Sequence, residues 1–136
     1  MGFISAIVTC LVEKYAVFEG RASRSEYWWF TLFLFLAGFL IFVVGVLLTV
    51  MAGPAADMVG TLTAIAVWIF GIAILIPSIA VTVRRLHDIN LSGWMYLAVV
   101  AGSFIPFIGI LVLIGFYVLM AWPGNDDLNN YGEVPA

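Results

Sequence analysis

Charged and aromatic side chains gather in two short segments of the chain, residues 18–29 and residues 84–94. The first segment reads Phe-Glu-Gly-Arg-Ala-Ser-Arg-Ser-Glu-Tyr-Trp-Trp, and the second begins Arg-Arg-Leu-His-Asp. Guanidinium groups bind carboxylates and phosphates through paired hydrogen bonds. The segments therefore indicate either a site for an anionic lipid headgroup or other phosphate-bearing ligand, or an ion-pair network that closes the fold. The candidate cluster consists of Arg21, Arg24, Glu26, Arg84, Arg85, His87 and Asp88.

The acidic residues near the arginines favour the ion-pair network. If a helix continues through residues 84–88, Asp88 lies four positions after Arg84 and three after Arg85, so its carboxylate can pair with either. On the side of the basic residues, and before the tail is counted, four acidic residues offset the five basic ones, which leaves one net positive charge; the acidic residues are Glu13, Glu19, Glu26 and Asp88. Each basic residue contributes about 1 kcal/mol near an anionic surface, so this balance predicts no strong attraction to one.

His87 and Cys10 are the only histidine and the only cysteine. A metal site needs several such donors, and one cysteine forms no intrachain disulfide. An enzyme acting on lipid headgroups would have to use His87 and Asp88 as its acid–base pair. One histidine beside one acid is weak evidence for such an enzyme. We therefore expect no enzymatic activity, no metal site and no cofactor.

The elements that carry these two segments are predicted to be membrane helices. Of the 136 residues, 65% are hydrophobic, only five are Lys or Arg, and eight are Asp or Glu. Three runs contain no charged residue, at positions 27–56, 58–83 and 89–125. About 20 apolar residues cross a bilayer, whereas about a quarter of a soluble domain is charged. The composition excludes a soluble enzyme, a disordered chain, a disulfide-framed secreted domain and a nucleic-acid binder, and it makes the lipid bilayer a partner.

The first two runs predict two full transmembrane helices in an all-α integral membrane fold. A Ser-x-x-Glu capping box at residues 23–26 begins the first helix, over residues 24–51. A Gly-Pro break separates it from the second helix, over residues 58–83. Pro77 removes the hydrogen bond to the carbonyl of Ala73, which predicts a kink there with serine or threonine hydroxyls bonding nearby carbonyls.

The third run is too long for one crossing, because its 37 residues would extend about 55 Å as a helix. Two glycines and Pro106 interrupt it near the middle. We expect a short helical hairpin over residues 92–103 and 107–122, and the rival interpretation is one long Pro-kinked helix. An acidic tail, residues 123–136, completes a single membrane domain.

Residues 1–18 predict an amphipathic helix that lies in the membrane interface. The apolar side chains that recur at helical spacing are Phe3, Ile4, Ile7, Val8, Leu11, Val12 and Tyr15. The opposite stripe consists of Gly2, Ser5, Thr9 and Glu13. The expected interfacial anchors are Trp28, Trp29 and Trp94.

The basic residues predict which end of the helices faces the cytoplasm. Lys14, Arg21 and Arg24 precede the first crossing, and the other two basic residues follow the second. The loop around Asp57 contains none, so the positive-inside rule places the basic side and the N-terminus in the cytoplasm. A hairpin over the third run returns the C-terminus there, whereas a single crossing would not.

These motifs resemble those of small bacterial inner-membrane proteins grouped as domain of unknown function 805. The shared pattern is F-x-G-R-x-x-R-x-E-Y-W at residues 18–28, R-R-L-H-D with a following S-G-W at residues 84–94, P-x-x-G at residues 106–109, and P-G with N-x-Y-G near the end. The family often has arginine where this chain has Asn130, a departure that argues against the tail joining the charged cluster. The resemblance implies an inner-membrane location and no known activity or cofactor.

The function that these observations favour is a non-catalytic module. It would bind a partner membrane protein or an anionic lipid through the cytoplasmic Arg, Asp and Trp cluster. The alternative is a homo-oligomeric pore or transporter subunit, suggested by the breaks at residues 102–109. No span contains Asp, Glu, Lys, Arg or His, so a proton relay or an ion-coupled carrier would lack its usual groups.

Overall fold

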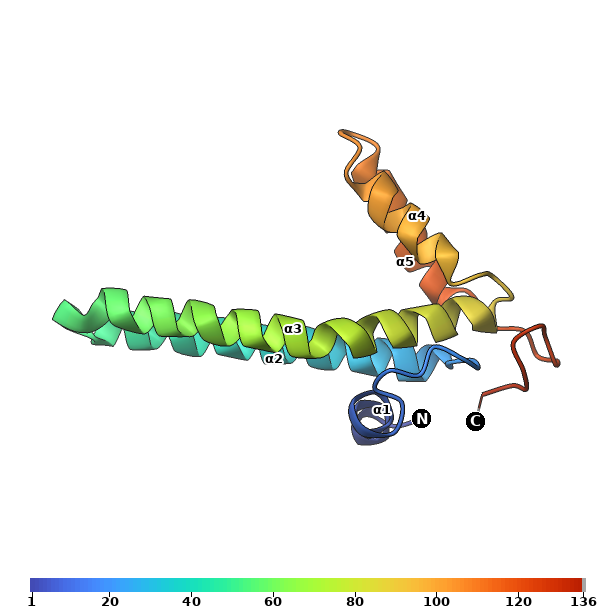
Figure 1. The fold of residues 1–136 in the computed structure, drawn as a ribbon, viewed down its shortest axis with the longest axis horizontal. Helices are drawn as coiled ribbons and strands as arrows, with labels where there is room; N and C mark the ends of the chain where they lie inside the picture. Colours follow the sequence, from blue (N-terminus) through green and yellow to red (C-terminus); the bar gives the residue numbers. More distant parts are fainter. Residues whose placement is uncertain (136) are drawn as a thin grey trace.

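The structure, a computed structural model, describes residues 1–135, which form helices and no strand beyond one isolated bridge between Asn129 and Gly132. The helices are α1 (Phe3–Val8), which continues into the π-helical turn η1 (Thr9–Glu13), α2 (Arg24–Met51), α3 (Ala56–Asp88), α4 (Trp94–Ser103) and α5 (Gly109–Ala121). A 3₁₀ turn, η2 (Gly53–Ala55), joins α2 to α3. The fold is therefore two helical hairpins preceded by a short helical segment (Figure 1).

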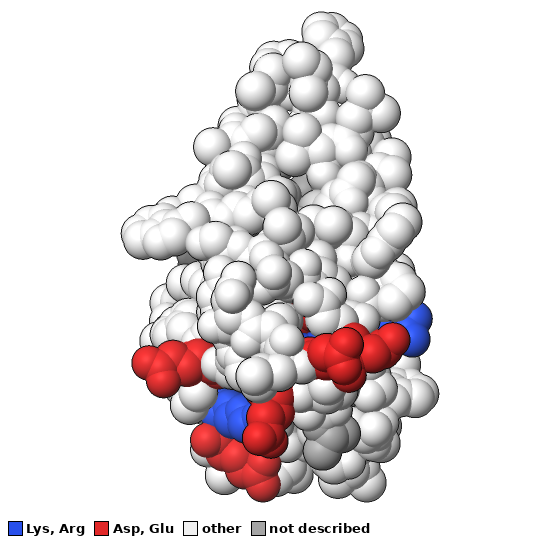
Figure 2. All heavy atoms as spheres, turned by 90° about the vertical axis from the view of Figure 1, so that its right-hand side faces the viewer, with Lys and Arg blue, Asp and Glu red and all other residues white. Residues whose placement is uncertain are grey.

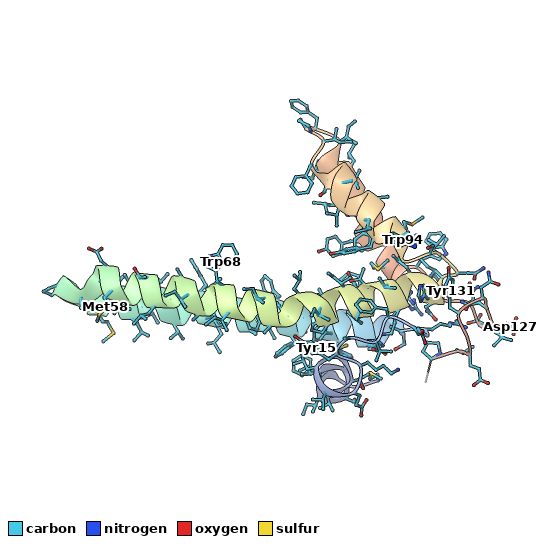
Figure 3. All side chains as sticks on the ribbon, in the orientation of Figure 1. Tyr15, Met58, Trp68, Trp94, Asp127 and Tyr131 are labelled. Atoms are coloured by element: carbon cyan, nitrogen blue, oxygen red, sulfur yellow. The ribbon has the colours of Figure 1, made fainter. Side chains whose placement is uncertain are left out.

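Helices α2 and α3 pack side by side as a long hairpin (Figure 1). Their 28 and 33 residues correspond to about 42 and 50 Å, enough to cross a hydrocarbon core of about 30 Å. Gly45 lets them approach closely, because a Cβ there would lie 2.1 Å from Cγ2 of Thr63. Most of their apolar side chains face outward, and Phe35 and Trp68 are 68% and 73% exposed (Figure 3). Such a surface is expected where lipid covers the helices.

Helices α4 and α5 form a second, shorter hairpin that leaves one end of the long hairpin at an angle (Figure 1). The chain turns between Ser103 and Gly109, with Phe107 in the left-handed region at φ +64°. A Cβ at Gly109 would lie 2.2 Å from the carbonyl oxygen of Ser103, so only glycine fits this turn. Residues 89–125 are thus two helices, with 10 and 13 residues, rather than one kinked helix.

Helix α3 extends past the predicted end at residue 83, and this boundary is corrected to Asp88. Asn90 adopts the left-handed conformation at φ +60° and ends the helix. The amide of Asn90 donates to the carbonyl of His87 at 3.0 Å, and the amide of Leu91 donates to that of Leu86 at 2.9 Å. This pattern is a Schellman motif with asparagine in place of glycine. The Arg-Arg-Leu-His-Asp motif is therefore helical.

The N-terminal helix is shorter than the predicted residues 1–18, since α1 and η1 end at Glu13. It crosses the long hairpin and packs through small side chains (Figure 1). The buried side chains are Ala6, Thr9 and Cys10. Thr9, predicted on the polar stripe, is buried. Its hydroxyl is satisfied there, since it donates to Oε2 of Glu13 at 2.8 Å. The outward side includes Ile4, Val8 and Val12.

All of these elements meet at one end of the long hairpin, where both chain ends also lie (Figure 1). The buried hydrophobic core is at this end and consists of Cys10, Ala22, Tyr27, Phe30, Val81, Leu86, Phe116 and Met120. The core therefore surrounds the two charged segments instead of lying along the membrane-spanning helices.

Candidate functional site

Five of the seven residues in the predicted cluster lie together at this end, and all five are buried. They are Arg21, Glu26, Arg84, Arg85 and Asp88, which we call the arginine network. Figure 2 shows this end of the molecule, with acidic side chains over its lower part and little basic surface. The small basic area agrees with the burial of three of the five basic side chains.

Asp88 lies between two arginines at the C-terminal end of α3. Its Oδ1 accepts a hydrogen bond from Nε of Arg21 at 2.9 Å, and its Oδ2 accepts one from Arg85. The predicted pairing within the motif is therefore made by Arg85, three positions before Asp88, and not by Arg84. Because Arg21 comes from the segment before α2, this triad joins that segment to the end of α3.

Arg84 pairs with Glu26 near the start of α2, with Nη1 to Oε1 at 2.5 Å. The Cys10 thiol donates to the same oxygen at 3.7 Å, so η1, α2 and α3 meet at one carboxylate. The predicted capping box is only half formed: Ser23 Oγ accepts from the amide of Glu26 at 3.3 Å, while the Glu26 side chain turns to Arg84. Nε and Nη2 of Arg84 are buried without a partner among residues 1–135.

The remaining guanidinium donors bond backbone carbonyls at the end of α5 and in the C-terminal tail. Arg85 donates from Nε to the carbonyl of Met120 at 3.0 Å and from Nη2 to that of Trp122. Arg21 donates from Nη1 to the carbonyl of Asp127 at 2.8 Å, and also bonds the carbonyl of Asn125. The tail therefore joins the charged cluster, contrary to the expectation from Asn130, and it does so through carbonyls instead of side-chain charges.

Gly124 lies directly against the triad. A Cβ at this position would be 1.9 Å from Oδ2 of Asp88, and the amide of Asn125 donates to the Asp88 carbonyl at 3.0 Å. The Pro-Gly pair after α5 thus has a packing role, because a larger residue would displace the tail from Asp88.

His87 is half-buried and holds the tail from the other side of α3. Its Nδ1 lies 3.1 Å from the carbonyl oxygen of Gly20, so this nitrogen carries the proton. The ring stacks on Tyr131 with 3.9 Å between centroids, and Asn129 donates to the His87 carbonyl at 2.8 Å. Both carboxylate oxygens of Asp88 bond arginines. His87 therefore makes no acid–base pair with Asp88 in this structure.

Besides His87, four predicted residues lie outside the arginine network. Arg24 is exposed and forms no ion pair with any residue in the part of the chain that the structure describes. Trp28 and Trp29 are partly exposed on α2, and Trp94 is 79% exposed at the start of α4 (Figure 3). These aromatic side chains are available to a membrane interface or a partner.

Tyr15 has a role that the sequence analysis missed. Its hydroxyl donates at 2.5 Å to the carbonyl of Ala73, the group that Pro77 leaves without its helical partner. The expected local hydroxyls serve other carbonyls: Ser78 donates to Ile74 at 2.6 Å, and Thr82 donates to Ser78 at 2.7 Å. The N-terminal segment thus supplies the hydrogen bond that Pro77 removes from the Ala73 carbonyl, from a residue 58 positions earlier in the chain.

Two cavities are lined by residues next in sequence to the arginine network, although no member of the network lines either of them. The wedge cavity, about 180 Å³, lies in the angle between the two hairpins and has six hydroxyl-bearing side chains in its lining: Tyr27, Thr31, Ser78, Thr82, Tyr96 and Tyr117. The interface groove, about 630 Å³, lies between α3, α4, the loop before α2 and the tail. Among residues 1–135, no group of three or more His, Cys, Asp or Glu is placed to hold a metal ion.

Known proteins with similar sequences are membrane proteins. The family described as "Protein of unknown function (DUF805)" matches residues 15–133. The chain is 35% identical to the inner membrane protein YhaI of Escherichia coli strain K12 over 126 residues, covering 92% of this chain and 91% of YhaI. It is 37% identical to the inner membrane protein YhaH of that strain over 125 residues, covering 92% of each. No solved structure is significantly similar to the chain.

Proposed function

We propose a function for this chain, which belongs to the DUF805 family of proteins of unknown function: it is a non-catalytic membrane module that binds a partner membrane protein. The family match confirms the resemblance that the motifs indicate, and the similar proteins are named inner membrane proteins. The family description names no enzymatic activity that would assign a reaction.

The observation that carries the proposal is the wedge cavity. The two hairpins are fastened together at one end only, and hydroxyl groups from both line the angle between them. Thr31, Ser78 and Thr82 already donate to carbonyls of their own helices, which leaves the hydroxyls of the three tyrosines, Tyr27, Tyr96 and Tyr117. Lipid chains offer these hydroxyls no hydrogen bond, whereas a transmembrane helix with polar side chains does. Part of the Tyr117 side chain is exposed at this angle, within reach of an entering helix. The wedge is therefore the surface that we assign to the partner.

The arginine network supports a partner protein over an anionic lipid as the bound species. All three of its guanidinium groups are buried and pair with carboxylates. The two donors of Arg84 that lack a partner are themselves buried, so a lipid phosphate would have to leave the membrane surface and enter the fold to reach them, or break the ion pairs at a large cost. In the proposal the network holds the two hairpins together at one end. It thereby sets the shape of the wedge between them, without contacting the partner.

The proposed orientation places the fastened end in the cytoplasm. The basic residues lie at that end, and the loop between α2 and α3 contains none. The N-terminal segment and the tail share this end, so both belong to the cytoplasmic side. Reporter fusions at the two termini test this orientation, because it requires both to report a cytoplasmic location.

Photo-crosslinking in native membranes tests the partner. A photoreactive amino acid replaces Tyr117, which lines the wedge cavity, or Val118, a neighbour of similar exposure outside its lining. The proposal expects a discrete protein adduct from position 117 and a much weaker one from position 118. Equal, diffuse labelling from both positions would contradict it. An adduct with a second copy of this chain would instead favour the homo-oligomeric pore or transporter subunit.

A further inference from the structure

The interface groove changes from apolar to polar along one face of α3. Ile79, Val83 and His87 follow each other at every fourth position in its lining, a span of about 12 Å along the helix. The polar end coincides with the charged end of the molecule, where Trp94 and Tyr131 lie at the base of α4 (Figure 3). The change in polarity thus follows the direction from the membrane-spanning part toward its surface.

The apolar end of the groove suits a hydrocarbon chain. Leu97 and Tyr96 of α4 face Ile79 and Val83 of α3 across it. Gly93 allows this arrangement, because a Cβ there would lie 2.7 Å from Cγ1 of Val83. The cavity of about 630 Å³ lies within the range of about 300–1,000 Å³ that is usual for small-molecule sites.

The polar end offers hydrogen-bond acceptors and aromatic faces, and no cationic side chain lines it. Glu19 is exposed there and forms no ion pair with residues 1–135. Because His87 carries its proton on Nδ1, its Nε2 is an acceptor in the neutral ring. Phe18 and Trp94 add aromatic rings, which attract ammonium groups. The neighbouring Arg21 is bound to Asp88 and the tail.

We propose that the interface groove binds a membrane phospholipid whose headgroup carries an ammonium group. The acyl chain lies between α3 and α4, and the ammonium binds the carboxylate of Glu19 beside the aromatic rings. This site and the wedge are different cavities that share one lining side chain, Tyr96.

Native mass spectrometry of the purified full chain tests the site. The protein, in mild detergent, is mixed with equal amounts of phosphatidylethanolamine and phosphatidylglycerol that carry identical acyl chains. We expect retention of phosphatidylethanolamine to exceed that of phosphatidylglycerol by about fivefold, the factor that one ammonium contact provides. A phosphatidylethanolamine whose amine is acetylated should lose this preference, a comparison that needs no variant protein.

Two charge-matched variants locate the contact. Glu19→Gln should bring the retention ratio of the two lipids close to one, while Glu133→Gln, in the exposed tail outside the groove, should leave it unchanged. Leu97→Trp, which fills the apolar end, should lower retention of both lipids. Equal retention of the two lipids by the unmodified protein, undiminished retention of the acetylated lipid, or an unchanged ratio in Glu19→Gln would overturn the proposal. None of these results depends on the crosslink at Tyr117.

Discussion

Arg84 and Glu26, 58 positions apart in the chain, form a buried ion pair with 2.5 Å between Nη1 and Oε1. The pair joins the start of α2 to the last turns of α3, within the long hairpin. In the Arg21–Asp88–Arg85 triad beside it, Arg21 bonds the tail, and Arg85 bonds carbonyls at the end of α5. Of the 13 charged residues in the chain, the five of this network are buried inside the fold. The network therefore acts as the junction of the two hairpins.

Loss of Arg85 should destabilise the protein far more than loss of Arg24. Arg85 is buried and bonds Asp88 and the carbonyls of Met120 and Trp122, whereas Arg24 is exposed. Removing one partner of a buried pair costs about 3–5 kcal/mol, so Arg85→Ala should unfold much earlier in thermal scans in detergent. Arg24→Ala is the matched control, and an equal effect of the two changes would refute the assignment.

Substitution of Gly124 by alanine should release the tail from α3. The added Cβ would clash with Oδ2 of Asp88, whereas alanine at Gly115 meets no atom within 4 Å. Hydrogen exchange of the amides in residues 123–132 should accelerate in Gly124→Ala and stay unchanged in Gly115→Ala. If both variants retained the same tail protection, Gly124 would have no packing role.

The sequence predicted the members of the charged cluster well, but it predicted less well which residues form ion pairs with each other. Asp88 suits an arginine three or four positions earlier equally well, so local spacing does not distinguish Arg84 from Arg85. The partner of Arg84 comes from α2, and only the packing of α2 on α3 decides that contact. Helical spacing alone therefore left this pairing open.

Two other parts of the site differ in how far the sequence reveals them. The sequence places the end of α3 too early, because the first charged residues mark the membrane boundary and not the end of the helix. The signal for the true end is Asn90, a residue type that ends helices in the left-handed conformation. The tail binds Arg21 through backbone carbonyls, which every residue possesses. No side-chain pattern identifies such acceptors. The sequence feature that does point to this contact is Gly124, which packs against Asp88.

Cys10 should react very slowly with maleimide. Burial, together with the nearby Glu26 carboxylate, raises the pKa of its thiol from 9.0 to about 12. Since the thiolate is the reactive form, the rate at pH 8 should be about a thousandfold below that of an exposed cysteine. A variant with Cys10→Ala and Val12→Cys provides that exposed comparison. Similar labelling rates for the two proteins would show that Cys10 is accessible.

The hydrogen bond of Tyr15 should matter only while Pro77 is present. Tyr15→Phe leaves the Ala73 carbonyl without its donor, which should cost about 0.5–1.5 kcal/mol. Alanine at position 77 restores the backbone amide that normally bonds this carbonyl. In the Pro77→Ala background, Tyr15→Phe should therefore have a clearly smaller effect in thermal unfolding. The same cost in both backgrounds would mean that Tyr15 contributes in another way.

A double-mutant cycle on Glu26 and Arg84 tests the role of the network most directly. Thermal unfolding in detergent is measured for Glu26→Met, Arg84→Met and the double variant. Each single change leaves a buried charge unpaired and should cost about 3–5 kcal/mol, while the double change removes both charges and should cost far less than their sum. Additive effects of the two changes, or single variants as stable as the unmodified protein, would contradict a buried ion pair that holds α2 to α3 at the end where the two hairpins meet.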